Sequence, residues 1–125
     1  MIPGECRLQE STVQTLSGNV EPLNPVQCPE SLVLADCSET PSFVITRQQD
    51  GGIKMYDGDH NLYNTTSDIM KNSPILPIAA GLKVQSDATG VIIYKRFNET
   101  VILIPSSYMP SVCGECAGDI IYNSC

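Results

Sequence analysis

Short runs of β-branched and aromatic residues, separated by turn-forming residues, fill the middle of the chain, and hardly any helical period is sustained over ten residues. Residues 43–46 and 53–56 flank a segment that contains Asp50-Gly51-Gly52, where glycine supplies the positive φ that a hairpin connection needs. Residues 82–85 and 91–97 are separated by Ser, Asp, Thr and Gly, which also favour turns. The pattern predicts an all-β, antiparallel, β-sandwich-like domain with little helix.

The clearest predicted hairpin joins residues 91–97 to residues 100–104 through Asn98-Glu99. β-Branched and aromatic side chains dominate both arms, so we expect this hairpin at the centre of the sheet. Residues 31–36 fit either a strand or one helical turn and are left unassigned. The nine prolines, which include Pro22 and Pro77, lie mostly between apolar runs, where a missing amide hydrogen does least harm to a sheet.

Length and charge limit the classes of protein. A chain of 125 residues fits one small domain, residues 1–125. Seven Lys and Arg oppose fourteen Asp and Glu, and the net charge of -7 repels phosphate, so no nucleic-acid partner is predicted. The longest apolar runs, residues 91–93 and 101–105, are far shorter than the roughly twenty residues of a membrane-crossing helix, so no membrane span is predicted.

An even count of six cysteines in so short a chain favours an oxidised, secreted, extracellular protein. The first six residues have neither the basic start nor the apolar core of a signal peptide, so we expect a mature segment, a processed fragment or a domain of something longer. Two sequons, Asn64-Thr65-Thr66 and Asn98-Glu99-Thr100, are candidate N-glycosylation sites, Asn64 and Asn98 being the acceptors.

The cysteines form an early and a late group with a thiol-free middle between them. Six cysteines allow fifteen pairings, and the spacing favours bridges that join the N-terminal third to the C-terminal tail. The early group and the late group are Cys6, Cys28, Cys37 and Cys113, Cys116, Cys125.

The two cysteine groups carry a resemblance to a known family. Residues 28–38, CPESLVLADCS, resemble the early cysteine pair of the von Willebrand factor type D domain, and the apolar residues 43–45 resemble the strand that follows it. Cys113-Gly114-Glu115-Cys116 resembles the closing Cys-Gly-Leu-Cys signature of that family. Within the family, the sequence around residues 34–38 looks most like the type D domain of vitellogenin and other large lipid transfer proteins.

The resemblance implies a complete set of disulfides: Cys6 with Cys116, Cys28 with Cys125, and Cys37 with Cys113. In the family an early aspartate and a polar loop after the closing cysteines can hold calcium. Here Ser17 occupies the place of that aspartate, and Asp119 is the only carboxylate after residue 116. We therefore predict no metal site of the family type and no cofactor.

Alternative chemistry has little support in the residues. The Cys113-x-x-Cys116 spacing occurs in thiol–disulfide oxidoreductases, but Glu115 between the thiols disfavours a thiolate and no Lys or Arg lies nearby in sequence. Zinc would leave other cysteines unused, and the only histidine is His60, in an acidic turn. No Gly-x-Ser-x-Gly motif indicates a hydrolase. No catalytic residue is therefore predicted, and two structural half-cystines are the favoured interpretation of the motif.

These observations and the resemblance together predict a non-catalytic structural or interaction domain of a secreted lipid transfer or yolk protein. Its partners would be other domains of that protein, with a receptor or lipoprotein as a further candidate. The alternatives are an assembly module of a mucin-like or matrix protein and, third, a thiol–disulfide redox module. The flanking sequence and the state of the thiols discriminate among them.

Overall fold

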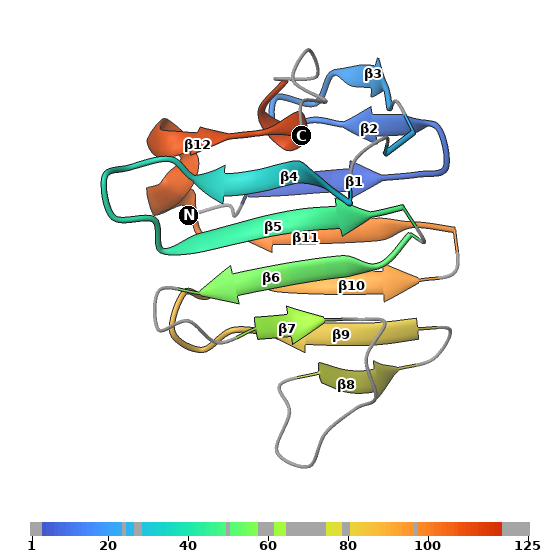
Figure 1. Ribbon diagram of the computed structural model, residues 1–125. Helices are drawn as coiled ribbons and strands as arrows, with labels where there is room; N and C mark the ends of the chain where they lie inside the picture. Colours follow the sequence, from blue (N-terminus) through green and yellow to red (C-terminus); the bar gives the residue numbers. More distant parts are fainter. Residues whose placement is uncertain are drawn as a thin grey trace.

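Two antiparallel β-sheets are stacked face to face in the computed structural model (Figure 1). The residues that the structure describes are 4–23, 25–26, 29–49, 51–57, 62–64, 75–78, 81–96 and 98–118. The all-β sandwich architecture predicted from the alternation of apolar runs and turns is confirmed. The only helical elements in these residues are two short 3-10 helices, η1 (Ser106–Ser111) and η2 (Glu115–Ala117).

The larger sheet has seven strands and the smaller sheet has five. In spatial order the larger sheet contains β3 (Val20–Pro22), β2 (Thr12–Gln14), β1 (Gly4–Leu8), β11 (Thr100–Ile104), β10 (Ile92–Arg96), β9 (Gly81–Gln85) and β8 (Ile75–Ile78). The smaller sheet contains β12 (Val112–Cys113), β4 (Glu30–Asp36), β5 (Phe43–Gln48), β6 (Ile53–Asp57) and β7 (Leu62–Asn64).

Three of the predicted strand pairs are present with the expected partners. β5 pairs with β6 across the glycine-containing turn, and β9 pairs with β10. β10 also pairs with β11, and β11 is the fourth of the seven strands, so the predicted hairpin does lie at the centre of its sheet. Local turn chemistry was sufficient to predict these three pairs because each connects neighbouring segments of the chain.

The core is the space between the two sheets, and alternate residues of strands such as β1 and β6 fill it. Phe43 and Ile45 of β5 are 1% and 0% exposed and belong to the same buried cluster as Ile93 and Ile102 of the larger sheet. The larger set of fully buried side chains consists of Phe43, Leu34, Ile45, Met55, Ile93, Ile102, Ile104, Val13, Val33, Val84, Val91 and Cys6. Cys6 thus occupies a core position in β1.

Residues 31–36, which the sequence left between strand and helical turn, belong to strand β4. The register of β4 against β5 shifts between Leu32 and Leu34, which is a β-bulge. Val33 and Leu34 are consecutive residues and both are fully buried. A period of two is therefore absent from this part of the sequence, and this explains the ambiguity.

Proline marks both edges of the larger sheet. Pro22 ends edge strand β3, and Pro77 lies in edge strand β8. An edge strand tolerates a residue without an amide hydrogen, and proline there discourages pairing with another chain. The prolines therefore lie within strands as well as between them, at the positions where a sheet accepts them.

Candidate functional site

The cysteines bring the last described part of the chain onto the sandwich. We call residues 111–118 the C-terminal clasp; it contains β12, the glycine that follows, and η2. Cys116 is bonded to Cys6 of β1, and Cys113 is bonded to Cys37 at the end of β4. The Cα–Cα distances are 5.7 and 5.9 Å, within the range usual for disulfides. These are two of the three pairs that the family resemblance implies; Cys28 and Cys125 lie outside the described residues.

The two disulfides differ in their access to solvent. Cys6 and Cys116 are both 0% exposed, inside the hydrophobic core. Cys37 is exposed and Cys113 is half-buried at the edge of the smaller sheet. A soluble reductant can therefore approach the second bond directly but reaches the first only when the core opens.

Strand β12 extends the smaller sheet at its edge and fixes the position of Cys113. Val112 and Cys113 pair with Asp36 and Ala35 of β4. The next residue, Gly114, has φ +114°, and a Cβ atom there would lie 2.7 Å from the carbonyl oxygen of Val33. Only glycine fits this close approach to the β-bulge, so the glycine of the Cys113-x-x-Cys116 motif has a structural reason.

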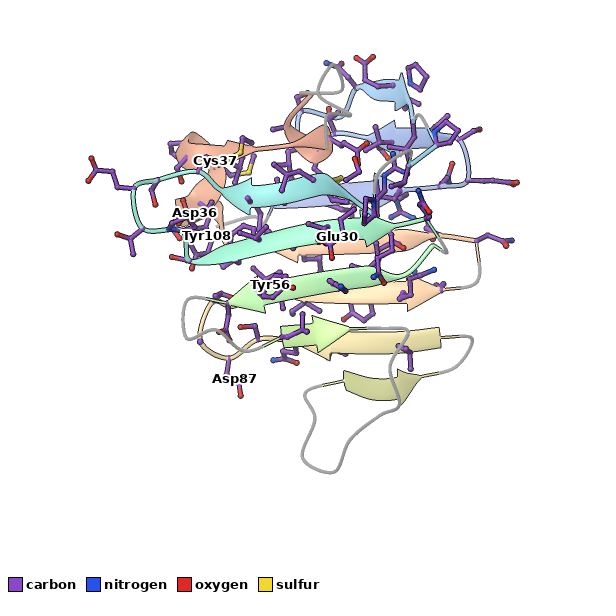
Figure 2. All side chains as sticks on the ribbon, in the orientation of Figure 1. Glu30, Asp36, Cys37, Tyr56, Asp87 and Tyr108 are labelled. Carbon is purple, nitrogen blue, oxygen red and sulfur yellow. A yellow bond between two sulfur atoms is a disulfide. The ribbon has the colours of Figure 1, made fainter. Side chains whose placement is uncertain are left out.

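Asp36 connects the clasp to the loop after β4 (Figure 2). Its carboxylate accepts hydrogen bonds from the hydroxyl groups of Ser111 and Ser38, at 3.0 and 3.1 Å, and from the amide groups of Ser42 and Ser38, at 3.0 and 3.3 Å. Burial raises the pKa of Asp36, but these hydrogen bonds, led by that of Ser42, outweigh it and hold the pKa below its usual value. The ionised carboxylate thus stabilises the attachment of the clasp.

Glu115, in the middle of the motif, is paired with a cation that is distant in sequence. Arg47 Nε and Nη2 donate to Glu115 Oε1 and Oε2, both at 2.8 Å. The two side chains are 12% and 4% exposed, so the ion pair is largely buried. Sequence proximity had indicated no Lys or Arg near this motif, but the fold places Arg47 against it. The inward position of Arg47 could have been predicted from the alternation of β5, because Arg47 follows Phe43 and Ile45 on the inward-facing side.

This arrangement decides what the Cys113-x-x-Cys116 motif can do in the oxidised protein. Its two sulfur atoms are bonded to different, distant cysteines and not to each other. The dithiol of an oxidoreductase closes a bond within the motif when it is oxidised. Here each cysteine instead holds one end of a long loop, of sequence separation 110 or 76.

The turn at residues 15–18 lies against the clasp. The amide group of Leu16 donates to the carbonyl oxygen of Cys116 at 2.9 Å. Ser17, which replaces the aspartate of the family pattern, shares a hydrogen bond with Thr15 at 2.9 Å and accepts one from Asn19 at 3.3 Å. Within the described residues no three His, Cys, Asp or Glu side chains are grouped so as to hold a metal ion.

Of the two candidate glycosylation sites, Asn98 is exposed in the turn between β10 and β11, where the amide group of Arg96 donates to the carbonyl oxygen of Glu99 at 2.8 Å. Asn64 is the last residue of β7, and its sequon continues into residues 65 and 66, outside the described residues. Because Asn98 is exposed in this turn, a sugar attached to it would not displace the core.

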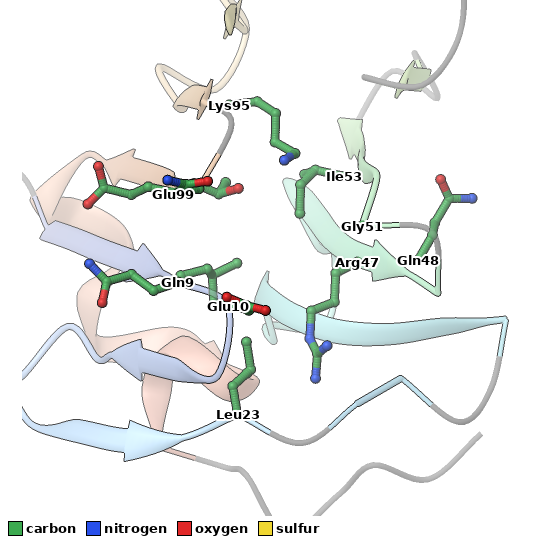
Figure 3. A pocket seen from close by; sticks show the side chains of 12 residues that line it. Gln9, Glu10, Leu23, Arg47, Gln48, Gly51, Ile53, Lys95 and Glu99 are labelled. Carbon is green, nitrogen blue, oxygen red and sulfur yellow. The ribbon is translucent and has the colours of Figure 1, made fainter. Parts of the chain in front are cut away.

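A pocket of about 420 Å³ opens at the end of the sandwich that carries Asn98 (Figure 3). One wall comes from the larger sheet and includes Leu8, Lys95 and Thr100. The opposite wall comes from β5, β6 and their connection and includes Arg47 and Ile53. The volume is within the roughly 300–1,000 Å³ of small-molecule sites. The pocket could not be predicted from the sequence because its walls come from segments far apart in the chain.

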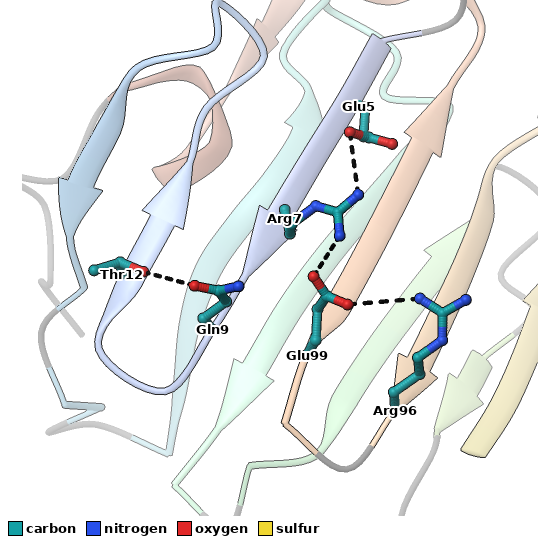
Figure 4. Close-up of polar contacts among 6 residues, drawn as sticks. All are labelled: Glu5, Arg7, Gln9, Thr12, Arg96 and Glu99. Atoms are coloured by element: carbon teal, nitrogen blue, oxygen red, sulfur yellow. Dashed lines mark hydrogen bonds and ion pairs between the residues drawn. The ribbon is translucent and has the colours of Figure 1, made fainter. Parts of the chain in front are cut away.

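A network of charged side chains covers the outer face of the larger sheet beside this pocket (Figure 4). Glu99 forms ion pairs with Arg7 of β1 and with Arg96 of β10, and Arg7 also pairs with Glu5. The hydrogen bond from Arg7 to Glu99 leads the effects that raise the pKa of Arg7. These residues link β1, β10 and the turn between β10 and β11 across the sheet surface.

The outer face of the smaller sheet has an exposed apolar pair. Tyr56 of β6 and Leu62 of β7 are direct cross-strand neighbours and are 38% and 49% exposed. Adjacent exposed apolar side chains on a sheet surface are suited to contact with another protein surface.

No protein-family model and no curated protein matches the chain in the comparisons made with it. Among the residues that the structure describes, no helix is both long enough and apolar enough to cross a membrane.

Proposed function

We propose that this chain is a non-catalytic extracellular domain that contributes a stable, disulfide-linked structure and contact surface to a larger secreted protein. The observation that carries the proposal is the separate use of Cys113 and Cys116, each in a long-range disulfide. Disulfides persist in oxidising compartments, which is compatible with an extracellular protein. Glu115, the buried glutamate between the two cysteines, forms an ion pair with Arg47 and adds a further structural link.

The resemblance of the cysteine motifs supports a narrower proposal, a von Willebrand factor type D-like domain of a vitellogenin-like lipid transfer or yolk protein. In such a protein, bulk lipid would be held by other domains. The sandwich interior supports this division, because large apolar side chains fill it. The exposed Tyr56 and Leu62 would serve contacts with neighbouring domains or with a receptor.

Thiol measurements test the structural role. The protein secreted from eukaryotic cells should contain no thiol that reacts with a maleimide after denaturation without reductant. It should also fail to catalyse the reduction of insulin by dithiothreitol. Reactive thiols at Cys113 and Cys116, together with insulin reduction, would instead establish the redox alternative.

The sequence of the full-length precursor tests the narrower proposal. A vitellogenin-like protein places a very long lipid-binding region before this domain. Further cysteine-rich modules after it would favour the mucin-like or matrix alternative and overturn the lipid-transfer proposal.

A further inference from the structure

The pocket at the end of the sandwich includes a candidate glycosylation site in its own lining. Asn98 and Thr100, the first and third residues of the sequon, both line it. Asn98 belongs to the larger sheet's β10–β11 turn, whereas Gln48, Gly51 and Ile53 line the pocket from the smaller sheet. A group attached to Asn98 therefore starts at the pocket, within reach of the opposite sheet.

The walls combine an apolar surface with polar side chains. Leu8 and Ile53 are 5% and 3% exposed, and Leu23 packs beside them at the edge of the core. Gln9, Glu10 and Lys95 supply amide, carboxylate and ammonium groups around this surface (Figure 3). A pyranose ring has the matching chemistry, because its C–H face packs on apolar side chains while its hydroxyl and acetamido groups exchange hydrogen bonds.

The charges around the pocket do not select an ion of either sign. The charge of Arg47 is opposed by Glu115, and that of Glu99 by Arg7 and Arg96. Lys95 and Glu10, one positive and one negative, remain as lining groups for which no ion pair is found within the described residues. A neutral polar ligand fits this balance better than a strong anion or cation does.

We propose that Asn98 carries an N-linked glycan. Its first N-acetylglucosamine folds back into this pocket and links the two sheets at the end of the sandwich that carries Asn98. In the modification, Asn98 Nδ2 bonds to the anomeric carbon of the sugar, loses one proton, and displaces the pyrophosphate of a lipid-linked oligosaccharide donor. The proposal rests on the secretory location proposed above, because the modifying machinery is found there. Covalent attachment gives the sugar a high effective concentration at the pocket, so individually weak contacts suffice.

Hydrogen exchange across the pocket tests the contact. The amide groups of Gln48 and Gly51 donate to Gly52 and Gln48 carbonyl oxygens, at 2.8 and 3.0 Å, in the turn opposite Asn98. We expect these two amides to exchange at least about tenfold more slowly in the glycosylated protein than in Asn98→Gln. Trimming the glycan to one N-acetylglucosamine with an endoglycosidase should preserve this protection, and complete removal with an amidase should abolish it.

Two controls separate docking from a general effect of glycosylation. Asn64→Gln should leave exchange at Gln48 and Gly51 unchanged. In the glycosylated protein, Leu23→Ala should lose most of the protection, whereas Val20→Ala, at a position 66% exposed and outside this pocket, should keep it. Protection confined to the β10–β11 turn, or equal exchange in the glycosylated protein and Asn98→Gln, would overturn the proposal.

Mass spectrometry of the secreted protein distinguishes this proposal from the proposed function. An unmodified Asn98 in a protein with fully bonded cysteines would overturn the glycan proposal and leave the structural role intact. Free thiols at Cys113 and Cys116 would contradict the structural role regardless of the state of Asn98.

Discussion

Arg47 and Glu115 form a two-pronged ion pair in the interior, each nitrogen–oxygen contact measuring 2.8 Å, although the residues are 68 positions apart. One comes from a central strand of the smaller sheet and the other from the segment between two disulfide-bonded cysteines. The pair thus joins the clasp to the sheet at a point where neither disulfide does.

Removing one member of this pair should be costly. Glu115→Ala leaves the guanidinium group buried without its carboxylate, and we expect a loss of about 3–5 kcal/mol in the free energy of unfolding, measured by denaturant titration with disulfides intact. The double variant Arg47→Met with Glu115→Leu should recover most of this loss. Glu30→Ala is the matched control: its ion pair with Lys54 is also 2.8 Å long but more exposed, so it should cost less than about 1 kcal/mol. Equal losses in the two single variants would contradict the expectation.

The carboxylate of Asp36 should make stability depend on pH. Because its pKa is lowered in the folded protein, its contribution is present above the unfolded value of about 3.9 and is lost as pH falls through the folded pKa. Asp36→Asn should therefore be less stable than the parent by about 1–3 kcal/mol at pH 7, and the difference should shrink below about pH 4. Urea titrations from pH 7 to pH 2.5 measure it. Asp87→Asn, in an exposed turn, should differ little throughout, and a pH-independent difference for Asp36→Asn would refute the prediction.

The two disulfides should be reduced in a fixed order. Cys37 is exposed, whereas Cys6 and Cys116 are fully buried. Brief treatment with a phosphine reductant under native conditions, followed by alkylation and peptide mapping, should label Cys37 and Cys113 first. Unfolding the protein in denaturant before reduction should abolish the order. Labelling of Cys6 and Cys116 before the other pair in the native protein would show that the core opens faster than the exposed bond is attacked.

Gly114 should be far less replaceable than Gly118. Both have positive φ, +114° and +91°, but only at Gly114 would a Cβ atom collide with backbone, the Val33 carbonyl group. We expect Gly118→Ala to cost about 1 kcal/mol for backbone strain alone, and Gly114→Ala to cost about 2 kcal/mol more because β12 must move away from β4. Thermal unfolding of the two variants compares them. Similar melting temperatures would show that the bulge at Val33 adjusts freely.

The sequence predicted those parts of the fold that depend on neighbouring residues. The β5–β6 and β10–β11 pairs follow from apolar runs on either side of a turn. Strand β1 escaped prediction because its inward positions are Gly4, Cys6 and Leu8, only one of which is a usual apolar strand residue. Cys6 was interpreted only as a disulfide partner, and its second role as a core side chain was not predicted.

The contacts around the cysteines and the pocket could not be predicted, because they join residues that are far apart in the sequence. Arg47 meets Glu115 only because β5 turns that side chain inward and the clasp packs along the β4 edge of the smaller sheet. The pocket beside Asn98 likewise combines residues from both sheets, and no local pattern reports their proximity. The sequence identified the cysteines and the sequon but not the charged and apolar groups around them.

The position of β1 has a consequence for biosynthesis. Strand β1 pairs on one side with β2 through Arg7 and Leu8, and on the other, through all five of its residues, with β11, more than ninety residues later. At a translation rate of about 5–20 residues per second, the second edge of β1 and the Cys6 thiol wait roughly 5–20 s for their partners to be synthesised. During this interval the unpaired edge of β1 can pair with other chains. The smaller sheet differs in this respect, because four of its five strands, β4 to β7, have already been synthesised before β11 is made.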